Sequence, residues 1–294
     1  MALDVSVVIS TRNNLEGLKR VLTSLDEQTF LENRYEIFVA DDSDNSETQD
    51  HVTSLSRPKV ATYYYSSERQ GYQAGRNKCI KQTESNIILF LNDSCVAPAT
   101  LIEEHFKAHV AFPHAIVRGP LMPLRGLVMA ELPPFTAPQL DFTIINSSIP
   151  RLGIAKIETF DEACQESFQD TEMYWRLREC GFKETFVSPC YCFQNYLCYQ
   201  EHSLATIKSR AKYLADSAIE YYRSQPSSSR QEAIQLDFHL NVLQLLLANS
   251  AGHSIASSFL QGKLEGTGWL QSSLMDSEFY YYYYRFLKEQ LRSI

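Results

Sequence analysis

The sequence predicts an α/β protein with a mixed, mostly parallel, doubly wound sheet flanked by helices. Short apolar runs alternate with helical patterns through the first half of the chain, as they do in βαβ units. Two of these runs end abruptly in polar side chains, at Asp41-Asp42 and at Asn92-Asp93-Ser94. Such strand ends place polar groups at the carboxyl edge of the sheet, where open α/β sheets bind ligands.

Four apolar segments in the first half are predicted strands, and helical patterns lie between them. The first helix begins at Asn13-Asn14 and carries leucines at helical spacing, and Asn13 with Glu16 resembles a capping box. A second helix is predicted over residues 74–82. The predicted strands are Val5–Ser10, Ile37–Ala40, Ala61–Tyr65 and Ile87–Leu91.

The middle of the chain departs from this regular alternation. Gly119–Pro138 holds five prolines among apolar residues. A loop of this length is either a lid or binding loop, or an ordered connector. Asp141–Ser148 is a predicted strand, and Asp170–Cys180 is a predicted helix that ends at Gly181.

From about residue 203 the pattern becomes helical, which predicts a helical C-terminal extension. The sequence therefore suggests a first domain over residues 1–200 and a helical region over residues 201–294. Tyr280–Tyr284 is a run of five tyrosines, which either packs onto the main domain or forms a homo-oligomer interface. The predicted helices are Ser203–Ser224, Gln231–Asn249 and a segment near Ser277–Leu291.

Composition narrows the class of protein. The 294 residues are 44% hydrophobic and 21% charged, which is ordinary for a soluble globular protein with a sizeable core. A net charge of −8 argues against the basic face that nucleic-acid binding requires. No apolar run approaches the roughly 18 residues of a membrane span. The N-terminus resembles a first strand rather than a signal peptide, so we expect a cytoplasmic protein, with peripheral membrane attachment through the C-terminal helices left open.

Seven cysteines are present, an odd number that suits a reducing cytosol. Cys190, Cys192 and Cys198 lie close together in sequence, but their spacing fits no standard zinc pattern. We interpret them as buried or incidental residues, because free cysteine is among the most buried residue types.

Three acidic clusters are candidates for chemistry. A carboxylate of Asp41-Asp42 can accept hydrogen bonds from a base or ribose, or it can serve in an Asx turn. The Asn92-Asp93-Ser94 edge suits a hard cation that carries phosphates, although Ser94 stands where a second acid would be expected. Asp170 begins a predicted helix, either as a cap favoured by the helix dipole or as a general base that faces a pocket.

Five short motifs follow one another along the chain, and their order is informative. They read S-V-V-I-S-T-R-N, I-F-V-A-D-D-S, Q-G-Y-Q-A-G-R-N, I-L-F-L-N-D-S-C-V-A-P and F-D-E-A followed by Q-D-T-E-M-Y-W-R-L-R-E-C-G. This succession resembles the family 2 glycosyltransferases, inverting enzymes with the GT-A fold, which is a Rossmann-like fold. The resemblance covers about residues 4–185.

The resemblance implies roles for individual residues. It places Ser10, Arg12 and Asp42 at the nucleotide base. It places Asp170 as the catalytic base, while the preceding residue, Gln169, departs from the Glu-Asp pair of the family. Along the nucleotide-sugar it places Gly71, Arg76 and Asn77.

The resemblance also implies a divalent cation, Mn²⁺ or Mg²⁺, at the donor diphosphate. Asp93 and Ser94 match the motif that holds it, but a neutral hydroxyl is a weak ligand for a hard cation. A C-terminal histidine often completes the site, and His202 is the candidate. Gln194 is an alternative occupant of that position, and His202 is then a packed or solvated residue.

The implied function is transfer of a sugar from a nucleotide-diphosphate donor, with a UDP-sugar expected. The acceptor would be a hydroxyl of a glycan, a lipid-linked sugar, a protein or a small metabolite. A non-catalytic sugar-nucleotide-binding or scaffolding homologue is the alternative, because of Ser94 and Gln169. A nucleotidyltransferase is a third reading, which lacks the expected glycine-rich, basic N-terminal signature.

Overall fold

The computed structural model describes residues 3–55, 60–123, 143–162, 164, 169–194, 204–224, 253, 281–283, 285–287 and 289. These residues fall into two compact units, one formed by residues up to 194 and the other by residues from 204 onward. The boundary predicted between residues 200 and 201 stays a prediction. Among the described helices, none is long and apolar enough to cross a membrane.

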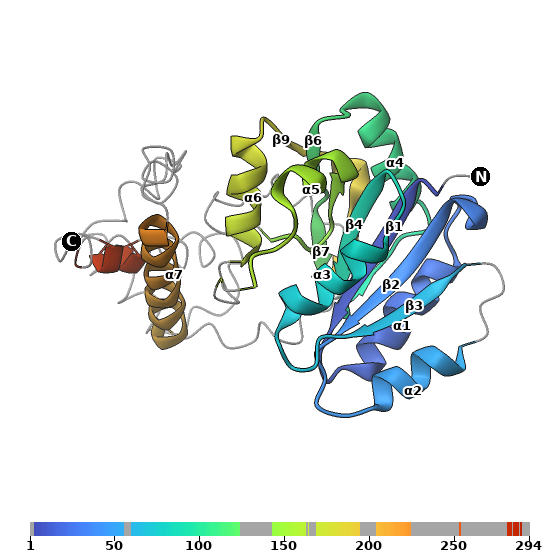
Figure 1. Ribbon diagram of the computed structural model, residues 1–294, viewed down its shortest axis with the longest axis horizontal. Helices are drawn as coiled ribbons and strands as arrows, with labels where there is room; N and C mark the ends of the chain where they lie inside the picture. Colours follow the sequence, from blue (N-terminus) through green and yellow to red (C-terminus); the bar gives the residue numbers. More distant parts are fainter. Residues whose placement is uncertain are drawn as a thin grey trace. The chain divides into compact units, whose positions relative to one another are not determined.

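The first unit is built on a seven-stranded sheet (Figure 1). All neighbouring strands are parallel except β8, which runs antiparallel to β4 and β6. The predicted mixed, mostly parallel sheet is therefore confirmed. In spatial order the strands are β3 (Thr62–Ser66), β2 (Tyr35–Asp41), β1 (Val5–Thr11), β4 (Ile87–Asn92), β8 (Ser147–Pro150), β6 (Ala115–Arg118) and β9 (Lys183–Phe186).

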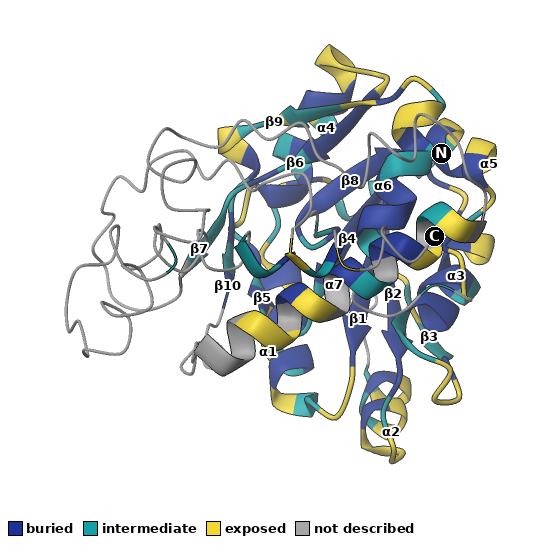
Figure 2. Ribbon diagram, turned by 90° about the vertical axis from the view of Figure 1, so that its left-hand side faces the viewer, coloured by how far each residue is buried: buried dark blue, intermediate teal, exposed yellow. Residues whose placement is uncertain are grey.

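Helices follow most of these strands and cover the sheet. In the first unit they are α1 (Leu15–Asp26), α2 (Glu47–Ser54), α3 (Tyr72–Gln82), α4 (Leu101–Ala111), α5 (Arg151–Ile157) and α6 (Gln169–Glu179), and the second unit contains α7 (Leu204–Ser224). Alternate residues of a strand point to opposite faces, so both faces of the central strands need cover. Figure 2 shows these strands almost wholly buried and the exposed residues gathered on the helices and loops.

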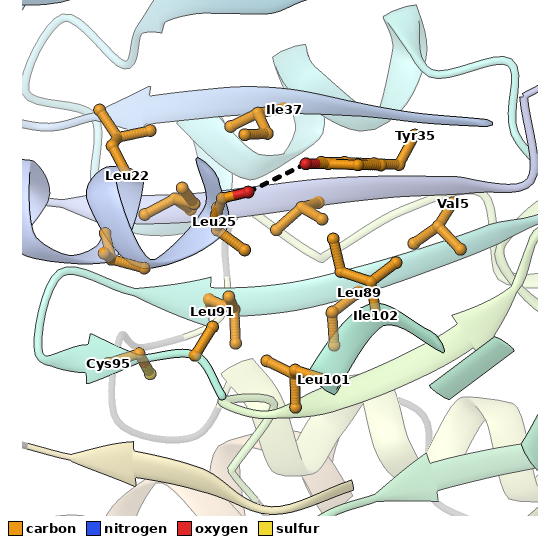
Figure 3. Close-up of a cluster of buried hydrophobic side chains, with 14 of the residues drawn as sticks. Val5, Leu22, Leu25, Tyr35, Ile37, Leu89, Leu91, Cys95, Leu101 and Ile102 are labelled. Carbon is orange, nitrogen blue, oxygen red and sulfur yellow. Dashed lines mark hydrogen bonds between the residues drawn. The ribbon is translucent and has the colours of Figure 1, made fainter. Parts of the chain in front are cut away.

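The main core lies on one face of the sheet, beneath α1 and the start of α4. It contains alternate residues of the central strands, such as Val7, Ile37 and Leu89, together with the apolar stripe of α1. The hydroxyl of Tyr35, which is buried in this cluster, donates a hydrogen bond to the carbonyl of Leu25 over 2.9 Å (Figure 3). The leucine spacing read from the sequence therefore does bury one face of the first helix.

A small second sheet extends the carboxyl edge. Its strands are β5 (Cys95–Val96), β10 (Cys192–Gln194) and β7 (Leu121–Pro123), in that order. Gln194 pairs with Cys95 across the antiparallel ladder and with Pro123 across the parallel one. The segment that follows β4 is thus tied to a strand about a hundred residues further along the chain.

The structure contradicts two local predictions and confirms a third. The cap of α1 is Asn14, whose side chain accepts from the Gly17 amide over 3.1 Å, so the box predicted at Asn13 is wrong. The strand predicted at Asp141–Ser148 is also misplaced, because β8 begins only at Ser147, after Asn146 with its φ of 55°. The helix predicted to end at Gly181 is confirmed, and that glycine has a φ of 87°.

Other predictions fall only partly within the described chain. Cys190 and Cys192 are buried free thiols, as expected. The helix at Ser203–Ser224 is confirmed as α7. The helix at Gln231–Asn249, Cys198 and most of Gly119–Pro138 lie outside the described residues.

Candidate active site

The predicted site residues of the first two strands and of β4 meet at one edge of the sheet. Ser10 pairs with Ala40 on one side and with Asn92 on the other. The chain continues from these strand ends into Arg12, Asp42 and Asp93. Because the three strands are parallel neighbours, their carboxyl ends form one continuous edge.

Asp42 is the centre of the predicted base-binding group. Its carboxylate is almost wholly buried and accepts hydrogen bonds from the Gly71 amide over 3.1 Å and from the Ser67 hydroxyl. The half-exposed guanidinium of Arg12 lies 3.6 Å from its other oxygen. Gly71 has a φ of 95°, a conformation that favours glycine, and it brings its N–H to Asp42. Arg12 and Asp42, predicted at the nucleotide base, therefore lie beside Gly71, predicted along the nucleotide-sugar, and their roles stay predictions.

The neighbouring acid, Asp41, is used within the fold. It accepts hydrogen bonds from the Ser43 amide over 3.0 Å and from the Tyr64 hydroxyl over 2.9 Å. Burial, followed by this hydrogen bond to the carboxylate, raises the pKa of Tyr64 to about 12. Asp42 rather than Asp41 is thus the acid of this pair that faces Arg12.

Arg76 connects the first strand to the predicted catalytic base. Its Nε donates to the Ser10 hydroxyl over 2.9 Å, and its Nη1 donates to Asp170 Oδ1 over 2.9 Å. The guanidinium carbon lies 5.3 Å from the centre of the Phe160 ring, which covers one side of the cation. Arg76 is therefore held rigidly between α3, β1 and α6.

Asp170 occupies the first turn of α6, where the helix dipole favours a carboxylate. Its Oδ2 accepts from the Ile144 amide over 3.1 Å, in addition to the contact of Oδ1 with Arg76. The side chain keeps 19% of its surface exposed. A carboxylate can accept about four hydrogen bonds, so each oxygen still has capacity for another donor.

Asn77 has a different surrounding. Its amide nitrogen donates to the Phe160 carbonyl and to Glu162, and its amide oxygen accepts from the Phe160 N–H, each over 2.9 Å. These contacts fix the segment that leads toward α6. Asn77 therefore positions Phe160 in this structure, and a direct contact with a nucleotide-sugar stays a prediction.

Asp93 braces the turn between β1 and α1. One of its oxygens accepts from the Thr11 hydroxyl over 2.8 Å and from the Arg12 amide over 3.4 Å. Burial raises the pKa of Asp93, and the hydrogen bonds from Thr11, Asn14 and Arg12 oppose that rise. A Cβ at Gly17 would lie 2.4 Å from the Asp93 carbonyl oxygen, so α1 approaches this edge at a glycine.

Ser94 belongs to an uncharged network. Its hydroxyl donates to Asn92 Oδ1 over 2.7 Å and accepts from Gln194 Nε2 over 2.9 Å. The same Asn92 oxygen accepts from the Ser94 amide and from the Cys95 thiol, each over 3.2 Å. Gln194 therefore lies beside Ser94, and whether it or His202 takes the histidine position stays a prediction.

The described residues do not fit a divalent cation at this edge. A hard cation prefers several oxygen ligands, among them carboxylates. Asp93 is the single carboxylate of the Asn92-Asp93-Ser94 motif, and Ser94 faces an amide N–H. No group of three histidine, cysteine, aspartate or glutamate side chains suited to a metal occurs within the described part of the chain. His202 lies outside it.

Sequence reasoning missed several residues that shape the site. Thr11 and Ser67 supply hydroxyl donors to Asp93 and Asp42, and Ile144 supplies a backbone donor to Asp170. Thr11 adjoins Ser10 at a strand end, which was a usable signal. The contacts of Ser67 and Ile144 depend on how separate loops meet, and no local pattern marks them.

Known proteins resemble the chain in sequence. The family model "Glycosyl transferase family 2" matches residues 6–122. The uncharacterized glycosyltransferase YfnE of Bacillus subtilis is 27% identical over 114 residues, which are 39% of this chain and 29% of that protein. The glycosyltransferase AglE of Haloferax volcanii is 30% identical over 96 residues, 31% of this chain and 30% of that protein. The match therefore spans about three tenths of the length of these curated relatives.

Solved structures resemble the chain in fold. The mannosyltransferase PcManGT from Pyrobaculum calidifontis, in complex with GDP-Man and Mn²⁺, has a TM-score of 0.65 at 12% identity, over 98% of this chain and 88% of that one. S. aureus TarS 1-349 in complex with UDP-GlcNAc has a TM-score of 0.53 at 14% identity, over 99% and 92%. With the order of the strands, these likenesses show that the chain has a GT-A-like fold, and its residues 6–122 match the family 2 glycosyltransferase model.

Proposed function

We propose that this protein is an inverting glycosyltransferase that moves a sugar from a nucleotide-diphosphate donor to an acceptor hydroxyl. Asp170 is the general base of this reaction. The observation that carries the proposal is the link through Arg76 from Ser10, at the end of the first strand, to Asp170. A buried arginine that holds a partly exposed carboxylate beside the ligand-binding edge is a costly arrangement, which suits a functional site better than a structural one.

The reaction follows from the geometry of a carboxylate with one accessible side. The acceptor hydroxyl gives its proton to Asp170 as its oxygen forms a bond to the anomeric carbon. The bond from that carbon to the donor phosphate breaks, and the nucleoside diphosphate leaves with the electron pair. Attack from the face opposite the leaving group inverts the anomeric configuration. Arg76 keeps Asp170 in one orientation throughout, which is the positioning that such a step requires.

The donor nucleotide is proposed to bind at Arg12, Asp42 and Gly71. A buried carboxylate beside a guanidinium offers an acceptor and a donor side by side, which suits the edge of a base. Uridine is the expected base, and UDP-GlcNAc and GDP-Man in the solved relatives make UDP- and GDP-sugars the first donors to test. The expected Mn²⁺ or Mg²⁺ takes no part in the steps above, because the described residues do not fit it.

A non-catalytic homologue that binds a sugar nucleotide is the second candidate. It is favoured by the two hydrogen bonds that already engage both oxygens of Asp170. In that case Asp170 would serve only to join α3, α6 and the Ile144 segment. The donor site would be the same, so nucleotide binding alone does not separate the two candidates.

One experiment separates them. The protein is incubated with UDP- and GDP-sugars, each with Mn²⁺ or with EDTA, against glycan, lipid-linked, peptide and small-molecule hydroxyl acceptors. Release of nucleoside diphosphate above the rate without protein, lost in Asp170→Asn, supports the transferase. Tight nucleotide binding without release in any combination contradicts it and supports the binding homologue. The two-domain division, the cytoplasmic location and a homo-oligomer through the C-terminal helices stay proposals of the same standing.

A further inference from the structure

We propose that the edge formed by Asn92, Ser94 and Gln194, here called the neutral rim, holds no divalent cation, so that this protein binds its nucleotide donor without one. This inference rests on the proposed function for the identity of the donor. It concerns a departure of this chain from the cation site that the family resemblance implies. Four observations within the described residues support it, and they come from three different segments of the first unit.

The first observation is the hydrogen bonding of Ser94. Its single hydroxyl proton is donated to Asn92 Oδ1, and its oxygen accepts from Gln194 Nε2. A cation bound to this oxygen would lie next to the positive end of the Gln194 N–H dipole. A hydroxyl in this position is therefore a worse ligand than an isolated one, which is itself weak for Mg²⁺ or Mn²⁺.

The second observation is that Gln194 cannot easily turn away. It lies in β10, between β5 and β7, and its backbone is in register with Cys95 and Pro123. The residue is 7% exposed. The two ladders fix the backbone of Gln194, and turning its side-chain amide away from Ser94 would leave a buried polar group without its partner.

The third observation concerns Asn92, which occupies the end of β4. Its amide oxygen accepts three hydrogen bonds, from the Ser94 amide, the Ser94 hydroxyl and the Cys95 thiol. An oxygen surrounded by three donors has no free lone pair for a cation. The donors also keep the turn after β4 closed around its own side chains.

The fourth observation concerns the remaining acid. One oxygen of Asp93 accepts from the Thr11 hydroxyl and the Arg12 amide, on the side of the β1–α1 turn. Asp93 thus serves to join two strand ends. Ser94 and Gln194 stand together where an acid and a histidine would form a cation site, and they complete each other's hydrogen bonds instead. Ser94 and Gln194 therefore replace two expected cation ligands with two neutral side chains that bond each other.

The test uses the full chain and two probes. Mn²⁺ alone is titrated and followed by electron paramagnetic resonance, which reports free Mn²⁺. Binding of UDP and of GDP is measured by calorimetry in Mn²⁺ and in EDTA. For the wild type we expect less than a threefold difference in nucleotide affinity between the two conditions, and no loss of the free Mn²⁺ signal. Ser94→Ala, which keeps the rim neutral, is the matched control and should behave in the same way.

The reverse substitution sharpens the test. Ser94→Asp with Gln194→His restores an acid and an imidazole to the rim, and should tighten nucleotide binding at least tenfold in Mn²⁺ over EDTA. Ser94→Asp alone, which keeps the Gln194 amide, should give a smaller increase in nucleotide affinity in Mn²⁺ over EDTA. Thermal unfolding followed by circular dichroism identifies a variant that fails to fold. If a variant fails, the wild-type measurements in Mn²⁺ and in EDTA still test the inference.

The outcomes are distinct. A wild-type protein that binds UDP or GDP tenfold more tightly in Mn²⁺ overturns the inference and leaves the proposed function standing. If neither nucleotide binds in any condition, the proposed function fails, and the Mn²⁺ titration alone then decides the inference. Wild-type Mn²⁺ binding that Ser94→Ala abolishes overturns it, whereas Mn²⁺ binding that changes neither with Ser94→Ala nor with nucleotide agrees with it.

Discussion

Arg76 and Asp170 form an ion pair over 2.9 Å, although 94 residues separate them in the sequence. The pair joins α3 to α6 beside the carboxyl edge of the sheet. Arg76 is nearly buried, with 6% of its side chain exposed, and Asp170 keeps 19%. The guanidinium therefore belongs to the interior, and the carboxylate lies at the boundary with solvent.

The first prediction concerns Asp170. Asp170→Asn preserves the size of the side chain but removes the proton acceptor, so transfer should fall by about 10²- to 10⁴-fold, the range for loss of a general base. Nucleotide affinity should change little. Steady-state transfer assays and calorimetry measure the two effects. Glu179→Gln on the exposed side of the same helix is the control and should leave both unchanged. Wild-type turnover in Asp170→Asn would show that the base lies elsewhere.

The second prediction concerns the other member of the pair. Arg76→Gln leaves Asp170 without its charged partner, so the free energy of unfolding should fall by about 3 kcal/mol, the lower end for a broken buried ion pair. Urea denaturation measures the change. Lys107→Gln, which breaks the exposed pairs of Lys107 with Glu103 and Glu104, should cost no more than about 1 kcal/mol. In Arg76→Gln/Asp170→Asn part of the loss should be recovered, and additive losses would contradict direct coupling.

The first half of the fold was predictable because its signals are local. Apolar runs long enough for a buried strand, and leucines repeating at helical spacing, carry their own evidence along the chain. The polar residues that end β2 and β4 could also be assigned to one edge, because parallel strands align their carboxyl ends. Strand β8 was misplaced because the extended pattern continues through Asn146, whereas the chain there adopts a positive φ.

Contacts between distant segments could not be predicted in the same way. Ser94 meets Gln194 because β10 inserts between β5 and β7, and these strands are only two or three residues long. So short a strand leaves no periodicity to read. The resemblance to a family suggested which positions matter, but the partner of each side chain follows from the packing of loops.

The third prediction concerns the approach of α1 to Asp93, in the turn after β4. Gly17 lies so close to Asp93 that an added Cβ would be 2.4 Å from a backbone carbonyl oxygen, which cannot move aside as a side chain can. Gly17→Ala should therefore destabilise the protein by about 1–3 kcal/mol, as overpacking does, and weaken nucleotide binding by moving Asp93. Denaturation and calorimetry measure the two effects. Glu16→Ala, at the exposed neighbouring position, is the control. If Gly17→Ala were as stable as Glu16→Ala, the close approach would be refuted.

The fourth prediction concerns two buried histidines on α4. His105 bonds Ser148 over 2.8 Å and Asn146 over 3.2 Å, and His109 bonds the same serine hydroxyl over 2.8 Å. Burial is the main cause that lowers the pKa of His105 to about 3 and that of His109 to about 4. Both imidazoles are therefore neutral in the folded protein at pH values where the unfolded chain protonates them.

These lowered pKa values make the folded protein less stable as the pH falls. Between about pH 6.5 and pH 4 the unfolded chain binds more protons than the folded protein, so stability is retained above pH 6.5 and falls as the pH falls. Each histidine contributes up to about 1.4 kcal/mol per pH unit in that range. Urea denaturation at pH 7.5, 6.0 and 5.0 measures the slope. His109→Gln keeps a polar side chain without titration and should flatten it, whereas His51→Gln, on a different helix, should not. An unchanged slope in His109→Gln would mean that this imidazole is protonated equally in both states.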